Sequence, residues 1–217
     1  MENRAESTAL AGCQLYLISP PTIDDHFTER LKIGLSAGPV AAFQLRLKGV
    51  SEDEIARLAE PLQRICAEHE TAFIINDSMA LAKRLGADGV HLGQGDGDPR
   101  AARALLGPTV QIGVTCHNSR HLAMEAGEKG ADYVAFGAFY ETGTKQTEFV
   151  AEMELLTWWN GLFELPCVAI GGITPITAPE LALTGVDFVA VSGAVWNDPM
   201  GEAAAIRAFA DALNLNG

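Results

Sequence analysis

The sequence has few basic residues, no long apolar run and no basic N-terminal leader. Its 15 Lys and Arg residues are outnumbered by 28 Asp and Glu residues, for a formal net charge of −13. A nucleic-acid surface needs a basic stripe, so this balance argues against a nucleic-acid partner. No stretch reaches the roughly 18 apolar residues of a membrane span, and the start does not resemble a signal peptide. We therefore expect a cytoplasmic protein with no membrane partner.

Cysteines are also scarce, and their spacing indicates no metal site. The chain has four, Cys13, Cys66, Cys116 and Cys167, with no C-x-x-C pair among them. Three of them fall within apolar strand or helix patterns, where a thiol is usually a small core residue. We expect neither a disulfide nor a zinc site.

The chain does contain a repeated sequence motif. Three copies cover 86–93, 130–137 and 185–192, and a looser relative covers 38–44. Each copy reads as a helix end, a turn and a buried strand, and each brings a polar residue within a few positions. Repeats of this kind, each after an amphipathic helical stretch, are typical of a parallel barrel of βα units. Functional residues are then expected where the strands end.

Eight apolar strands and intervening helices can be counted. The strands are predicted at 14–18, 41–47, 72–75, 89–92, 111–114, 133–136, 167–170 and 188–191. The clearest helix begins after Ser51, where Ser51 to Glu54 reads as a capping box; others are expected at 25–37, 78–85, 99–106, 119–128, 153–162, 178–183 and 201–213. No linker interrupts the pattern. We predict a single (β/α)₈ TIM barrel over residues 1–217, with 1–12 as a flexible extension.

Three polar residues alternate along the end of the second strand. Period-two alternation puts Gln44, Arg46 and Lys48 on one face, which is expected to point into the barrel. The guanidinium fork and the ammonium together suit a phosphate or diphosphate. The alternative is structural, with the two cations paired to barrel acids such as Asp77 or Asp88.

Two acids follow the third and fourth strands. Asn76 and Asp77 end the third strand, and Asp96 lies just beyond the fourth. Mg²⁺ is usually held in proteins by one or two carboxylates together with water and substrate phosphate oxygens. Asp77 and Asp96 are thus candidate Mg²⁺ ligands. Either one could instead cap the helix that follows it.

The fifth strand ends in Thr115, Cys116 and His117. Adjacent residues on an extended segment point to opposite sides, which argues against a Cys–His nucleophile pair. Thr115 is the better candidate for a contact with substrate. His91, within the fourth strand, is expected to be a satisfied interior histidine.

The remaining candidates follow strands six to eight. The long connection 138–152 carries Thr142, Thr144 and Lys145 around Gly143, a composition that suits an anion; it is either a lid or binding loop, or a surface insertion. Gly171 and Gly172 follow strand seven, and Val191 and Ser192 end strand eight. Loops at these two positions commonly bind phosphate in barrels, through backbone N–H groups and a helix N-terminus.

Six motifs in this order resemble the thiamine-phosphate synthase family. They are Gln44/Arg46/Lys48, Asn76-Asp77, Gly93-Gln94-Gly95-Asp96, Thr142-Gly143-Thr144-Lys145, Gly171-Gly172-Ile173 and Val191-Ser192. The resemblance implies a (β/α)₈ transferase that joins hydroxymethylpyrimidine diphosphate to a thiazole phosphate, or its carboxylated form, with Mg²⁺. The implied reaction is dissociative: diphosphate leaves, and the thiazole nitrogen captures the pyrimidine cation.

The resemblance also implies roles for individual residues. The pyrimidine diphosphate would be held by Gln44, Arg46, Lys48 and Asn76, and the Mg²⁺ by Asp77 and Asp96. The thiazole phosphate would be bound by Thr142 and Thr144 and by the backbone of Gly172, Val191 and Ser192. Lys145 would bind the diphosphate. Arg46, Lys48, Lys145 and Thr115 would be the catalytic set. The chain departs from the family pattern at Leu47, which is expected to face outward and matter little, at Thr115, where Ser is usual, and at Ala138, where Pro is usual.

Two other functions fit parts of the pattern. A thiazole tautomerase of the same barrel family would use the phosphate-binding loops, but Asp77, Asp96 and Lys145 would be idle in it. The other alternative is a non-catalytic sensor of a phosphorylated ligand, which would have kept the fold without the enzymatic activity. The sequence leaves open whether the chain forms a homo-oligomer.

Overall fold

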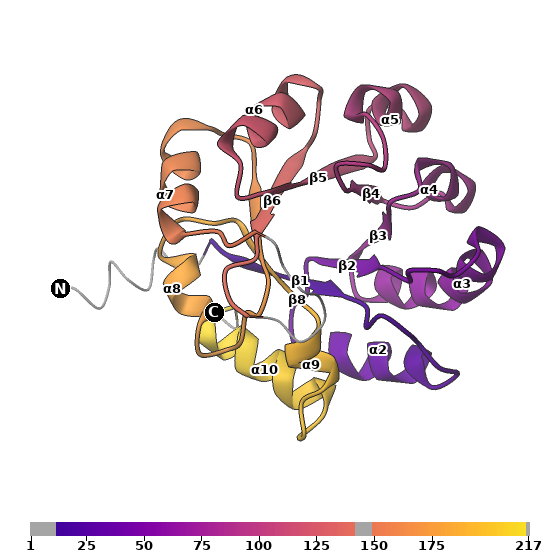
Figure 1. The fold of residues 1–217 in the computed structure, drawn as a ribbon. Helices are drawn as coiled ribbons and strands as arrows, with labels where there is room; N and C mark the ends of the chain where they lie inside the picture. Colours follow the sequence, from indigo (N-terminus) through magenta and orange to yellow (C-terminus); the bar gives the residue numbers. More distant parts are fainter. Residues whose placement is uncertain (1–11, 142–148, 216–217) are drawn as a thin grey trace.

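The chain folds as a closed barrel of eight parallel strands with helices outside it (Figure 1). A computed structural model describes residues 12–141 and 149–215. The strands are β1 (Gln14–Ile18), β2 (Ala42–Leu45), β3 (Ala72–Asn76), β4 (Gly89–Leu92), β5 (Gln111–His117), β6 (Tyr133–Gly137), β7 (Cys167–Ile170) and β8 (Phe188–Val191). They pair in chain order, and β8 closes on β1. The predicted (β/α)₈ barrel is confirmed.

Helices alternate with the strands around the barrel. They are α2 (Phe27–Leu35), α3 (Glu52–Glu68), α4 (Met79–Leu85), α5 (Pro99–Leu106), α6 (Arg120–Glu128), α7 (Met153–Leu162), α8 (Ala178–Ala182), α9 (Gly193–Trp196) and α10 (Glu202–Ala212). The expected start after Ser51 is confirmed, since its hydroxyl accepts from the Glu54 N–H at 3.3 Å. The Glu54 carboxylate bonds Arg57. The four-residue α9 was not predicted, because it is too short to show a period.

Some expectations concern residues that the structure does not describe. Residues 1–11, most of the predicted extension, lie outside the described ranges, as do Thr142, Thr144 and Lys145. No helix among the described residues is long and apolar enough to cross a membrane. All four cysteines are free, buried thiols, and burial raises the pKa of Cys116 to about 12.

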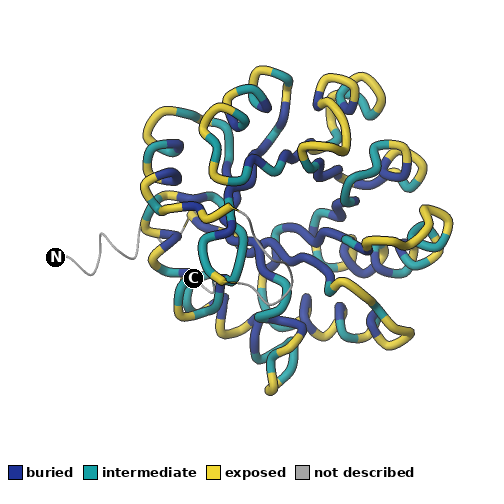
Figure 2. Tube along the Cα trace, viewed as in Figure 1, coloured by how far each residue is buried: buried dark blue, intermediate teal, exposed yellow. Residues whose placement is uncertain are grey.

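Apolar side chains fill two layers, because alternate residues of each strand point to opposite faces. One cluster lies inside the barrel and includes Tyr16, Ile74, Tyr133 and Val168. The larger cluster packs the outer face of the strands against the helices. Figure 2 shows that buried residues follow the strands and that exposed residues lie in the outer loops.

Two strands differ from the prediction in ways that affect the site. β2 ends at Leu45, so Arg46 and Lys48 lie beyond its last ladder position. Leu47 is only 7% exposed and belongs to the outer core, so it contributes to packing. β5 runs on to His117, with a register shift between Thr115 and His117 in its pairing with β6.

Each copy of the repeated sequence motif contains an aspartate that has a structural role at the end of the barrel opposite the strand exits. Asp88, Asp132 and Asp187 accept the backbone N–H of Phe73, Ile112 and Cys167, respectively, at 2.7–2.8 Å. In each case the carboxylate satisfies a donor near the start of the preceding strand. The alternative that pairs Asp88 with Arg46 or Lys48 is therefore wrong, because Asp88 lies at the other end of its strand.

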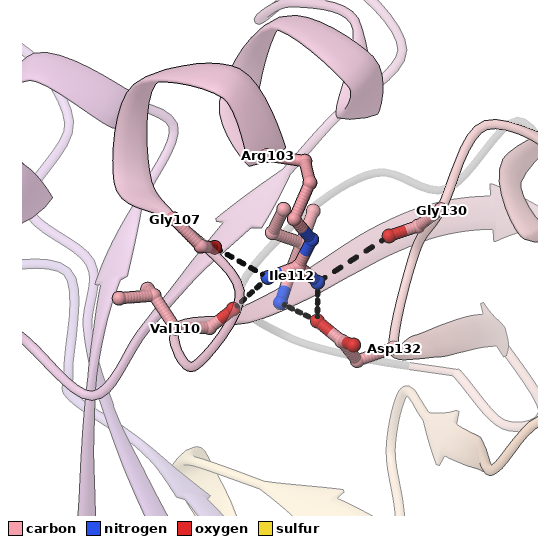
Figure 3. Close-up of polar contacts among 6 residues, drawn as sticks. All are labelled: Arg103, Gly107, Val110, Ile112, Gly130 and Asp132. Atoms are coloured by element: carbon pink, nitrogen blue, oxygen red, sulfur yellow. Dashed lines mark hydrogen bonds and ion pairs between the residues drawn. The ribbon is translucent and has the colours of Figure 1, made fainter.

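Asp132 is also tied to a helix end through Arg103 (Figure 3). The guanidinium of Arg103 donates to the carbonyl oxygens of Gly107 and Val110, both at 2.8 Å, and pairs with the Asp132 carboxylate. Both side chains of this ion pair are about one-third exposed or less. The contact joins the end of α5 to the turn before β6.

Asp132→Ala is therefore expected to lower the free energy of unfolding by about 1–2 kcal/mol, because it leaves the Ile112 N–H without its acceptor and removes the carboxylate that pairs with Arg103. Urea denaturation measures this change. Asp53→Ala is the matched control: it breaks the Arg84–Asp53 pair, whose side chains are 55% and 86% exposed, and should cost well under about 1 kcal/mol. Equal losses would contradict the assignment.

Candidate active site

A cavity of about 250 Å³ opens at the carboxyl ends of the strands. Strand exits from around the barrel contribute to its wall, as expected for this fold. The predicted site residues in the wall are Gln44, Arg46, Thr115, Gly171, Gly172, Val191 and Ser192. Lys48, Asn76, Asp77 and Asp96 are outside the set that lines the cavity.

The exit of β2 supplies the first part of the wall. Gln44 is 3% exposed, and its Nε2 donates to the Tyr16 hydroxyl at 2.9 Å. The backbone of Arg46 is held by Ser19, whose Oγ accepts from the Arg46 N–H at 2.9 Å. Lys48 is not among the residues that line the cavity. Its ammonium, on a side chain 55% exposed, pairs with the Asp77 carboxylate beyond the end of β2 at Leu45, as the structural alternative expected for this lysine.

Asp77 and Asp96 form an acidic pair beside Lys48. Burial, followed by a hydrogen bond with the Asp77 carboxyl group and its charge, raises the pKa of Asp96; the Gly93 N–H and Lys48 oppose the shift. The Asp96 carboxylate accepts from the Gly93 N–H at 3.0 Å. A carboxylate raises the pKa of a second one beside it, and such a pair suits a shared divalent cation. In residues 12–141 and 149–215 no cluster of three or more His, Cys, Asp or Glu side chains could hold a metal ion.

Neither acid caps a helix. Ser78 caps α4 by accepting from the Leu81 N–H at 3.1 Å, and Asp98 caps α5 by accepting from the Arg100 N–H at 2.7 Å. Asp77 instead has a left-handed backbone with φ of 66°, a conformation that is uncommon outside glycine and often found at functional sites. The helix-cap alternative is therefore wrong for both residues.

Asn76 is the last residue of β3 and lies next to His91 in the register. Ile74, two positions earlier, belongs to the cluster inside the barrel. The same alternation directs Asn76 toward the barrel axis, above Ile74 and close to Asp77.

His91 and Thr115 are bonded to each other inside the cavity. His91 is 8% exposed, as expected for an interior histidine, and its two ring nitrogens contact the Tyr133 hydroxyl at 3.1 Å and the Thr115 hydroxyl at 2.8 Å. Burial lowers the pKa of His91 to about 4, with a smaller lowering by Arg46 and an opposing effect of Asp77. The ring is therefore neutral at pH 7.

Cys116 and His117 lie on opposite sides of β5, in line with the sequence argument. Cys116 is fully buried in the outer core, where its thiol contacts the Val114 carbonyl oxygen at 3.5 Å. His117 lines the cavity, and its ring lies against that of Phe149 in a tilted arrangement, with ring centroids 4.4 Å apart. The two side chains cannot act together as a nucleophile and its base.

Gly171 and Gly172 have positive φ angles of 106° and 66°. A Cβ on Gly171 would lie 2.3 Å from the Ala138 Cβ, and one on Gly172 would lie 2.3 Å from the Glu141 carbonyl oxygen. The segment that leaves β6 thus occupies the space that side chains would fill. Glycine is therefore required at both positions for this close approach, and the backbone there is also available to a ligand.

The segment after β6 is also anchored at its far end. The Ala138 N–H donates to the Phe149 carbonyl at 3.1 Å, and the Ala151 N–H donates to the Ala138 carbonyl at 2.8 Å. The two ends of the long connection therefore lie side by side at the cavity. The Gly137–Ala138 peptide bond, where the family pattern has proline, is cis.

The exit of β8 closes the wall beside β1. The Ser192 hydroxyl donates to the Ser19 carbonyl oxygen at 3.1 Å, and α9 begins at the next residue. Ser192 is thus held in place by its side chain, while its backbone borders the cavity.

Sequence reasoning missed four polar residues of the cavity wall: Tyr16, Ser19, His117 and Tyr133. Tyr16 and Tyr133 lie within apolar strands, where both strand faces are buried and the pattern does not tell the barrel face from the helix face. A tyrosine in the middle of such a strand is nevertheless a usable signal, because its hydroxyl needs a buried partner.

Comparisons with known proteins agree with this site. A family profile described as "Thiamine monophosphate synthase" matches residues 15–195. The chain is 60% identical to the thiamine-phosphate synthase of Erythrobacter litoralis over 204 residues, covering 92% of this chain and 95% of that protein. It is 54% identical to the thiamine-phosphate synthase of Rhodospirillum centenum over 201 residues, covering 92% and 97%.

A solved structure gives the same result for the fold. Thiamine phosphate pyrophosphorylase from Pyrococcus furiosus superposes with a TM-score of 0.82 at 28% identity, over 94% of this chain and 97% of that one. The profile and the close relatives each cover most of the chain. The chain therefore belongs to the thiamine monophosphate synthase family and is a transferase.

Proposed function

We propose that this chain condenses hydroxymethylpyrimidine diphosphate with a thiazole phosphate to give thiamine phosphate and diphosphate, with Mg²⁺. The observation that carries the proposal is that Arg46 lines the cavity, while Lys48, Asp77 and Asp96 form one charged group at the neighbouring strand exits. A diphosphate leaving group needs positive charge where its own charge develops, and two cations with a bound metal would supply it. The similarity to synthases at up to 60% identity supports the same activity.

The residues of the cavity wall and of the adjoining strand exits suggest how the substrates lie. The pyrimidine diphosphate would be held by Gln44, Arg46, Lys48 and Asn76, and the metal by Asp77 and Asp96. The thiazole phosphate would be bound by the backbone of Gly172, Val191 and Ser192. Thr142 and Thr144, proposed for the thiazole phosphate, and Lys145, for the diphosphate, belong to the part of the chain that the structure does not describe.

The acid pair fits Mg²⁺ chemically. Asp77 is close enough to Asp96 to raise its pKa, so the two carboxylates repel each other when no cation lies between them. Lys48 neutralises only part of their negative charge. Two carboxylates leave coordination positions for water and for phosphate oxygens, the arrangement that Mg²⁺ favours. When bound, the ion would stabilise negative charge on the leaving diphosphate.

The reaction itself would need no nucleophilic side chain. The bond between the pyrimidine methylene carbon and the diphosphate oxygen breaks, and its electron pair leaves with the diphosphate. The lone pair of the thiazole nitrogen then forms the new C–N bond. Arg46 and Lys48 would stabilise the departing charge, and the apolar interior around Ala135 and Val168 would exclude water from the cation.

The test is the coupling reaction in the purified full chain, with thiamine phosphate measured by fluorescence after oxidation. We expect product with Mg²⁺, loss of product with EDTA, and recovery when Mg²⁺ is returned in excess. Folded protein that forms no product under any of these conditions would refute the proposal. Conversion of the thiazole tautomers without coupling would instead identify the tautomerase, and binding without turnover would identify a sensor.

A further inference from the structure

Lys48 is bonded to the acid pair of Asp77 and Asp96. Its ammonium forms an ion pair with the Asp77 carboxylate. Burial and the neighbouring Asp77 carboxyl group raise the pKa of Asp96, and the charge of Lys48 opposes that rise. In residues 12–141 and 149–215 no other lysine, arginine or histidine forms an ion pair with either acid. Within this part of the chain, the ammonium therefore supplies the positive charge that a metal ion would otherwise bring to the pair.

Backbone hydrogen bonds hold the two acids in place. The Asp77 N–H, just beyond β3, donates to the His91 carbonyl oxygen at 2.8 Å. The Asp96 N–H donates to the Gly93 carbonyl oxygen at 3.2 Å, and the Asp96 carboxylate accepts from the Gly93 N–H at 3.0 Å. The backbone of both acids is therefore fixed before a ligand binds.

Lys48 is held much less firmly than the acids. It lies beyond the last ladder position of β2, next to Gly49, whose φ angle is 75°. Its side chain is 55% exposed, and among the described residues Asp77 is the one to which its ammonium is bonded. An ion pair this exposed contributes little to stability, and an ammonium on a flexible stem readily changes partner. In an exchange of partners, the lysine would move and the acids would stay.

The position of Lys48 in the ligand-free chain conflicts with both ligands of the proposed site. Arg46 lines the cavity, but Lys48 is outside the set of lining residues. While its ammonium is bonded to Asp77, it also occupies a carboxylate that a divalent cation would need, and like charges repel strongly at such short range. Both conflicts disappear if Lys48 leaves Asp77 for the diphosphate when the cation binds.

We infer that Lys48 is an exchangeable counter-ion, which neutralises Asp77 in the ligand-free chain and moves to the diphosphate when Asp77 binds a divalent cation. Lys48 thereby couples the two ligands, because its release from Asp77 provides a cation for the diphosphate and its capture by the diphosphate leaves Asp77 open. The identity of the two ligands rests on the proposed function, whereas the competition between Lys48 and a divalent cation needs no turnover.

Competition is tested by the binding of Mn²⁺ alone to the purified full chain, measured from the loss of the EPR signal of free Mn²⁺. Mn²⁺ prefers the same oxygen ligands as Mg²⁺. We expect Lys48→Met to bind Mn²⁺ about 3–10-fold more tightly than the unmodified chain, because the competing ammonium is gone. Unchanged or weaker binding by Lys48→Met would overturn the inference.

Lys83→Met is the matched control for the change of charge. Lys83 is exposed and lies in the last turn of α4, toward the end of that helix away from Asp77. Its replacement should leave the affinity for Mn²⁺ within about 1.5-fold of the unmodified chain, because exposed charges beyond about 8 Å are largely screened at physiological salt. An equal gain in both variants would show an effect of net charge alone and would overturn the competition.

The movement of Lys48 is tested by a crystal structure of the chain with Mn²⁺ and inorganic diphosphate. We expect the Lys48 ammonium within hydrogen-bond distance of a diphosphate oxygen and more than about 4 Å from the Asp77 carboxylate. An ammonium that stays on Asp77 beside the bound metal would overturn the exchange.

Neither measurement needs turnover, so each separates the exchange from the proposed function. If Mn²⁺ binding and the position of Lys48 change as expected but the coupling assay forms no product, the exchange stands and the proposed function fails. If thiamine phosphate forms but Lys48→Met binds Mn²⁺ no more tightly, the proposed function stands and the exchange is overturned. Absence of Mn²⁺ binding to the unmodified chain and to Lys48→Met would also overturn the exchange.

Discussion

Asp96→Asn is expected to lower turnover by about 10²–10³-fold at saturating substrates, with little change in stability. The loss is of the size seen when one group that stabilises developing charge is removed. Asparagine keeps an oxygen that can accept from the Gly93 N–H, so the loop that Asp96 supports at 3.0 Å should survive. What it removes is one of the two negative charges in the pair with Asp77 that we propose for Mg²⁺.

The matched control for this prediction is Asp98→Asn. Asp98 lies two residues further on in the same loop, is exposed, and accepts from the Arg100 N–H at the start of α5. Asparagine caps helices about as well as aspartate, so both activity and melting temperature should stay close to those of the unmodified chain. Turnover of Asp96→Asn within about 3-fold of the unmodified chain at every Mg²⁺ concentration would rule out Asp96 as a ligand, because it falls far short of the expected loss.

Gly113→Val is expected to lower the free energy of unfolding by about 3 kcal/mol. A Cβ at Gly113 would lie 2.0 Å from Cζ of Tyr133 and 2.3 Å from its hydroxyl oxygen. The ring of Tyr133 lies across β5 because no side chain is present there, and its hydroxyl forms hydrogen bonds with the Tyr16 hydroxyl and with His91 Nδ1. Any side chain at position 113 must therefore move the ring and break those hydrogen bonds. Chemical denaturation measures the loss.

Gly161→Ala is the control for the effect of adding a side chain to a glycine. Gly161 lies near the end of α7, and a Cβ there would meet no atom within 4 Å. Alanine at a helical position should be neutral or stabilise by up to about 1 kcal/mol. In a Tyr133→Ala background, Gly113→Val should cost much less, because the ring that it displaces is gone. A full loss in that background would show that the cost arises elsewhere.

The positions of the strands were accessible from the sequence because each one is a short apolar run that follows an amphipathic helix. β1, β4, β7 and β8 were predicted with the bounds that the structure has. Errors occurred where a strand ends on polar residues: alternation extended the predicted second strand to Leu47, although the ladder of β2 ends at Leu45. Sequence periodicity could not predict the bulge at Cys116 or the four-residue α9, because both are too short to show a repeat.

The grouping of the candidate site followed from one physical rule, that parallel strands in a barrel present their carboxyl ends together. The rule brought Gln44, Arg46 and Thr115 to one cavity from two strand exits. It could not say which acids would be used as helix caps. That choice depended on Ser78 and Asp98, which take the caps and leave Asp77 and Asp96 as a pair.

The sequence alone determined the eightfold alternation of strand and helix, the end of the barrel where polar residues gather, and the family to which the chain belongs. The tertiary structure decided which strand faces meet inside the barrel, since both faces of a parallel strand are apolar. It therefore placed Tyr16 and Tyr133 beside His91 and Thr115. It also assigned the repeated aspartates to the strand starts. Those hydrogen bonds join segments distant in sequence, so their partners depend on barrel closure and register and are not encoded by any local pattern.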